Sequence, residues 1–154
     1  MQSVDISGLY DLDSRFQNLL SELPDMRREM HESAGAAVRD AVHAEIVASG
    51  IYDSHGKIRG WQELYIGSYG GYAAVRAVKG GVAGKNPGAI TNYLESGHRV
   101  RQPSGKAKQV RKSRAKQQRV KAYGFYRTSR GPAQNIAMTA ANKFADKVAG
   151  KLGD

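Results

Sequence analysis

The sequence predicts an α+β fold with an extended basic arm, in which a long N-terminal helix and a C-terminal helix pack on a small antiparallel sheet. Apolar residues recur every three or four positions towards both ends of the chain, which is typical of amphipathic helices. Two short runs rich in aromatic and branched residues lie between them and are typical of strands. Residues 99–121 contain no acid and are strongly basic. With 154 residues, we expect a single domain over 1–154.

The first helical region is predicted over 13–49. Asp13 or Ser14 suits its N-terminal cap, and its apolar side begins with Phe16, Leu19, Leu20 and Leu23. Pro24 is expected to interrupt the pattern and to occupy the first turn of the segment that follows. That segment is predicted to end near Ser49, with Gly50 as its C-terminal cap.

A hairpin is predicted over 57–79, with strands at 61–66 and 72–78. The five residues between them contain Gly70-Gly71, which can adopt the positive φ angles of a tight turn. Asn86-Pro87 then starts a short helix or turn over 88–95. After the basic arm, residues 123–127 suit a short strand or an aromatic anchor, and Gly131-Pro132 opens a C-terminal helix over 132–152.

The sequence lacks the residue patterns that are typical of enzyme active sites. It has no cysteine, no nucleophile signature, no phosphate-binding loop and no well-placed pair of carboxylates. Asp53 and His55 form a weak metal corner without a third ligand at a useful spacing. We therefore expect no catalytic, cofactor or metal site. No apolar stretch has the length of a membrane span, so we expect no membrane partner.

The positive charge of the chain is concentrated in one segment. The chain has 24 Lys and Arg against 14 Asp and Glu, and the ten basic residues of 99–121 account for the whole excess. These candidate contact residues are Arg99, Arg101, Lys106, Lys108, Arg111, Lys112, Arg114, Lys116, Arg119 and Lys121.

Three interpretations of this basic arm are open. It contacts nucleic-acid phosphates, or it packs on acidic surfaces of neighbouring proteins, or it is a solvated flexible loop. No aromatic residue lies within 99–121, so base stacking is not expected there. Fully extended, 23 residues reach roughly 75 Å, which suits a tether between parts of an assembly.

The segment Thr91-Asn92-Tyr93-Leu94-Glu95-Ser96-Gly97-His98 resembles the Tyr-x-Glu-Phe-Gly-Thr signature of a tailed-bacteriophage family of minor tail, tail-completion or neck proteins. The order of long helix, hairpin, signature, variable connection, aromatic-Arg element and closing helix is similar too. Ser96 stands where an aromatic residue is usual, and His98 where a small hydroxyl residue is usual.

The resemblance implies a non-enzymatic virion protein that is assembled in the host cytoplasm. It implies a hexameric ring of this chain, stacked between the head connector or stopper and the tail terminator or tube, with double-stranded DNA passing through the lumen. The motif residues Tyr93, Leu94, Glu95 and Gly97 would fix the fold or a subunit boundary. The alternative function is a small sequence-nonspecific nucleic-acid-binding protein that uses residues 99–121.

Overall fold

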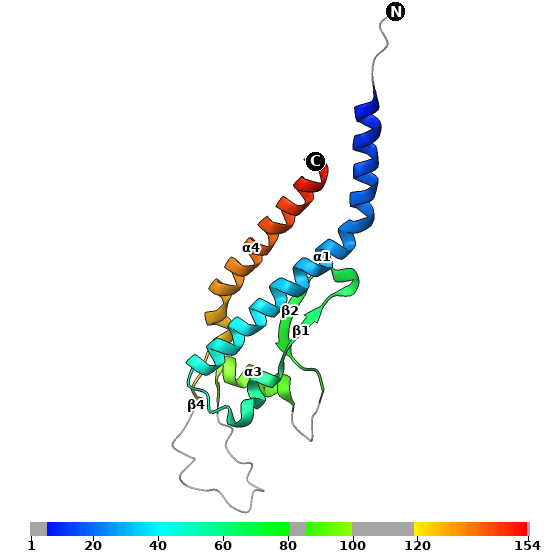
Figure 1. The fold of residues 1–154 in the computed structure, drawn as a ribbon. Coiled ribbons are helices and arrows are strands. Elements are labelled where there is room, and N and C mark those ends of the chain that lie inside the picture. Colours follow the sequence, from blue (N-terminus) through cyan, green and yellow to red (C-terminus); the bar gives the residue numbers. More distant parts are fainter. Residues whose placement is uncertain (1–5, 81–85, 100–118, 154) are drawn as a thin grey trace, which may run out of the picture. The chain divides into compact units, whose positions relative to one another are not determined.

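The computed structural model describes residues 6–80, 86–99 and 119–153, and it confirms the α+β fold (Figure 1). Long helices lie towards both ends of the chain, α1 over Ser7–Ala48 and α4 over Phe125–Gly153. Between them, β1 (Gln62–Ile66) and β2 (Ala73–Ala77) form a two-stranded sheet. The chain divides into a first unit of Met1–Asp40, Leu64–Val75 and Gly131–Asp154 and a second unit of Ala41–Glu63 and Arg76–Arg130. A single domain over 1–154 therefore stays a prediction.

Helix α1 is longer than predicted, and the interruption expected at Pro24 is wrong. The helix begins at Ser7 and continues to Ala48 with Pro24 inside it. A proline within a helix costs about 3 kcal/mol, because it removes a backbone hydrogen bond and crowds the preceding turn. Leu19 and Met26, which flank the proline, are each only 6% exposed, so burial on both sides offsets that cost. The predicted ending is confirmed, since Gly50 follows α1 with a φ of +74°.

The turn of the β1–β2 hairpin belongs to the first unit. The predicted position of the turn is confirmed, and Gly67 N donates to the carbonyl of Tyr72 at 2.8 Å. Gly70 has a φ of +66°, and a Cβ there would lie 2.8 Å from the Cβ of Arg28, so the turn requires glycine at this position. The second left-handed residue is Tyr69, with a φ of +56°, and not Gly71 as predicted.

Helix α4 begins well before the predicted start at Gly131-Pro132. Residues 125–127 form its first turn rather than a strand, and Phe125 is fully buried, as an aromatic anchor would be. The N–H and the hydroxyl of Thr128 both donate to the carbonyl of Gly124, at 2.9 and 2.6 Å. The core of the second unit contains Val42, Ile46 and Phe125, each 2% exposed or less.

Two short α-helices, α2 and α3, lie in the second unit. α3 (Pro87–Ser96) confirms the predicted segment 88–95, and the Asn86 side chain caps it by accepting from Ala89 N at 3.1 Å. α2 (Lys57–Gly60) occupies the start of the predicted hairpin region 57–79, ahead of the predicted strand 61–66, and β1 and β2 are each slightly shorter than predicted. The carboxylate of Asp53 accepts from backbone N–H groups of α2, which favours a helical turn there over a strand.

Candidate functional site at the base of the basic segment

Two short strands bring together the ends of the basic arm, which is the basic segment 99–121, and they form its base. β3 (His98–Arg99) pairs antiparallel with β4 (Arg119–Val120), so that Arg99 lies opposite Arg119. The chain therefore leaves and returns at neighbouring points. With both ends held, about 20 peptide units can extend at most about 35 Å from β3 and β4, roughly half of the reach expected for a free arm.

Three of the ten predicted contact residues lie within the described part of the chain, and all three are exposed: Arg99, Arg119 and Lys121. The other seven, Arg101, Lys106, Lys108, Arg111, Lys112, Arg114 and Lys116, lie outside the described residues. Like charges directly opposite each other on paired strands repel, so the Arg99–Arg119 pair favours a carboxylate or phosphate beside it. Lys121 Nζ lies 5.8 Å from the centroid of the Tyr123 ring.

Glu95 of the predicted motif caps α4. Its Oε2 accepts a hydrogen bond from Tyr126 N at 2.9 Å, and its Oε1 accepts one from Arg127 N at 3.0 Å. The first N–H groups of a helix have no partner within the helix and carry partial positive charge, so a carboxylate stabilises them doubly. The capping residue comes from α3, 31 residues before Tyr126, on the other side of the basic segment.

Backbone contacts hold the two flanks of the basic segment together next to this cap. The carbonyls of Leu94 and Glu95 accept from Tyr123 N at 2.8 Å and Gly124 N at 3.1 Å. Gly97 has a φ of +68°, and a Cβ there would lie 2.6 Å from the carbonyl oxygen of Val120. Only glycine permits this close approach, because both the backbone angle and the space exclude a side chain.

Tyr93, the first residue of the motif, is half-exposed and contacts His98. Their ring centroids are 4.9 Å apart with an interplanar angle of 43°. His98 Nδ1 is buried without a hydrogen-bond partner among the described residues. The structure thus brings together Tyr93, Leu94, Glu95 and Gly97 at the base of the basic segment. Their expected role at a subunit boundary stays a prediction.

A buried polar network under this base was not anticipated from the sequence. Gln62 is 2% exposed, and its Nε2 donates to the Ile58 carbonyl at 2.9 Å and to Thr91 Oγ1 at 3.3 Å. Its Oε1 accepts from the hydroxyl of Tyr126. Burial, together with the negative charge of Glu95, raises the pKa of Tyr126 to about 12. A lone glutamine at the start of a strand carries no sequence signal for such a role.

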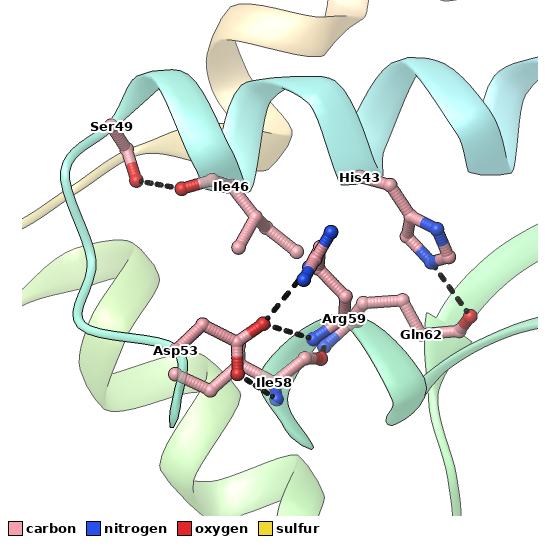
Figure 2. Close-up of polar contacts among 7 residues, drawn as sticks. All are labelled: His43, Ile46, Ser49, Asp53, Ile58, Arg59 and Gln62. Carbon is pink, nitrogen blue, oxygen red and sulfur yellow. Dashed lines mark hydrogen bonds and ion pairs between the residues drawn. The ribbon is translucent and has the colours of Figure 1, made fainter. Parts of the chain in front are cut away.

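Asp53 is engaged in the fold rather than available as a metal ligand (Figure 2). Its carboxylate accepts from Ile58 N at 2.7 Å, from Arg59 N at 3.2 Å and from Arg59 Nε at 3.1 Å. Burial acts to raise the pKa of Asp53, but these donors outweigh it and hold the pKa below its ordinary value. Nearby, His43 Nε2 lies 3.4 Å from the Gln62 carbonyl oxygen, which ties α1 to the start of β1 (Figure 2).

Within the described residues, no group of three or more His, Asp or Glu side chains is arranged to hold a metal ion. The helices of that same part of the chain include none with the length and apolar character needed to cross a membrane. Comparisons with protein-family models, with curated proteins and with solved structures find no match to this chain.

Proposed function

We propose that this chain is a structural virion protein of the neck or tail-completion region of a tailed bacteriophage, and that it forms a ring joining the head connector to the tail. The resemblance at Thr91–His98 and the order of elements around it support this function. The observation that carries it is the position of the motif, whose Glu95 and Gly97 hold the base of the basic segment. A base held in this way anchors both ends of the charged segment, as a contact between subunits or rings requires.

In this ring, the basic segment contacts acidic surfaces of neighbouring subunits or of the next ring. Arginine suits this role, because its planar guanidinium binds a carboxylate through two parallel hydrogen bonds. Arg99 and Arg119 would make the contacts nearest the base, since they lie opposite each other on β3 and β4. The same cations contact phosphates where the segment faces double-stranded DNA in the lumen.

The oligomeric state tests the ring. Native mass spectrometry and electron microscopy of the purified chain, alone and with neighbouring virion proteins, should show a closed ring with six copies. A chain that stays monomeric in every mixture would count heavily against the proposal. Gene neighbourhood offers an inexpensive check, because portal, capsid and tail genes should flank the gene.

The concentration of ten cations and no acid in residues 99–121 favours one alternative, a free sequence-nonspecific nucleic-acid-binding protein. That function requires DNA or RNA affinity that falls steeply with salt, because phosphate contacts release counterions. Gel shifts at low and high salt test it, with Arg111, Lys112 and Arg114 replaced by glutamine. The alternative fails if the wild-type chain does not bind at low salt, whereas ring formation does not depend on that result.

A further inference from the structure

The first turns of α1 expose a row of large apolar side chains. This apolar stripe consists of Leu9, Leu12, Phe16 and Leu20, which are 65, 41, 44 and 59% exposed. Three- and four-residue spacing places them along one side of the helix. Single exposed apolar residues are ordinary on protein surfaces, whereas a continuous row of this size marks an interaction surface.

The first unit also contains an open groove between α1 and α4 with a volume of about 480 Å³. Its apolar lining includes Met26, Met30, Ala34, Ala37, Ile136 and Phe144. The alanines leave hollows between the larger side chains, which is the relief that accepts side chains from another helix. Lys143 and Lys147 also line the groove, and Lys147 pairs with Glu29 at 2.9 Å.

One chain cannot place its own stripe in its own groove. The stripe and one wall of the groove both belong to α1, which is one continuous helix from Ser7 to Ala48. Phe16 of the stripe and Ala34 of the groove are 18 residues apart, or about 27 Å along the helix axis at 1.5 Å per residue. A helix cannot fold back over that distance, so a stripe that fills the groove has to come from another molecule.

We propose that the apolar stripe of one copy docks in the α1–α4 groove of a second copy. This inference rests on the proposed ring and names its subunit contact. The shapes are complementary, because leucine and phenylalanine side chains on the stripe meet alanine hollows in the groove. The charges are complementary as well, since exposed Asp13 borders the stripe and exposed Lys143 lines the groove.

The contact joins two different surfaces of the same chain, so each copy donates one stripe and accepts another. Such a head-to-tail contact builds a ring when the rotation between neighbours closes. A stripe-to-stripe contact would instead stop at a two-fold dimer. The two arrangements therefore differ in which pairs of positions come close together.

Disulfide cross-linking tests the contact cleanly, because the chain has no cysteine of its own. Phe16→Cys and Ala37→Cys variants are purified separately and then mixed under mild oxidation. A covalent dimer should form in the mixture and not in either variant alone. The matched control mixes Ser14→Cys with Met138→Cys, positions that helical spacing places on the opposite sides of α1 and α4, and it should give no dimer above background.

A dimer formed by Phe16→Cys alone overturns the proposal in favour of stripe-to-stripe pairing, and a mixture no better than the control overturns it outright. If the wild-type chain still forms a ring by native mass spectrometry in that case, the subunit contact is wrong and the ring stands. If the mixture gives no dimer above the control and the wild-type chain forms no ring, the subunit contact and the ring are both wrong. As a second readout, Leu12→Asp with Phe16→Asp should abolish the oligomer while circular dichroism stays unchanged, and Ser14→Asp should keep it.

Discussion

The base of the basic segment and the apolar stripe of α1 differ in the contacts that they make within one chain. At the base, the Glu95 carboxylate accepts two backbone hydrogen bonds and Gly97 lies tightly against the opposite strand. Along the stripe, Leu9 and Leu20 are more than half exposed. The contacts of Glu95 and Gly97 are made within one chain, whereas the proposed partner of the stripe is another molecule. Substitutions at the base should therefore lower stability, and substitutions on the stripe should change association.

Gly97→Ala should have the largest effect. It places a Cβ at a φ of +68° and 2.6 Å from the Val120 carbonyl oxygen, so we expect a loss of about 3 kcal/mol in the free energy of unfolding. The control is Gly50→Ala, which shares the positive φ but has no atom within 4 Å and should lose only about 1 kcal/mol. Urea denaturation measures both, and equal losses would show that the close approach at the base contributes nothing.

Glu95→Ala should lower the free energy of unfolding by about 2 kcal/mol, because it leaves the Tyr126 and Arg127 N–H groups of α4 without their acceptor. The matched control is Glu63→Ala, which removes an exposed carboxylate and should change stability by less than about 0.5 kcal/mol. Amide hydrogen exchange should show faster exchange in the first turn of α4 in Glu95→Ala alone. Unchanged exchange there would contradict the cap.

Tyr126→Phe should cost about 1 kcal/mol at neutral pH, because Gln62 Oε1 loses its hydroxyl donor. The pH dependence gives a second test. The pKa of Tyr126 is raised from an ordinary 10.0 to about 12. The protonated hydroxyl therefore contributes its full share to the free energy of unfolding below pH 10, and this share is lost as the pH rises towards 12. Urea denaturation from pH 9 upwards should therefore show the wild-type chain losing stability faster than Tyr126→Phe. Parallel curves would mean that the hydroxyl titrates normally.

Sequence periodicity was sufficient for elements that depend on local contacts. The two long helices, the hairpin and the short helix capped by Asn86 all follow from spacing and capping residues near them in the chain. The sequence predicts too late a start for α4, because its cap, Glu95, lies 31 residues from Tyr126. Local signals at Gly131-Pro132 point to a start there, and no local pattern reveals a distant carboxylate.

The candidate site was predicted in part. The motif residues were identified by resemblance, but the hydrogen bonds of Glu95 and the buried network of Gln62 depend on which helices meet, which a single sequence does not determine. The apolar side predicted for the first helix groups Phe16, Leu19 and Leu20 together. Leu19 is buried, whereas Phe16 and Leu20 are exposed, since periodicity identifies an apolar face without identifying what covers it.

The smallest effect on stability is expected at Leu20, and it separates the two regions most directly. At protein concentrations too low for association, Leu20→Ala should change the free energy of unfolding by less than about 0.5 kcal/mol, because that side chain is 59% exposed. Its neighbour is the control, since Leu19 is 6% exposed and Leu19→Ala should lose about 3 kcal/mol. At high concentration the order should reverse for association, with Leu20→Ala weakening the oligomer at unchanged monomer stability. If both variants lose the same stability in dilute solution, the stripe is packed within its own chain. The proposed difference between the base of the basic segment and the stripe would then be wrong.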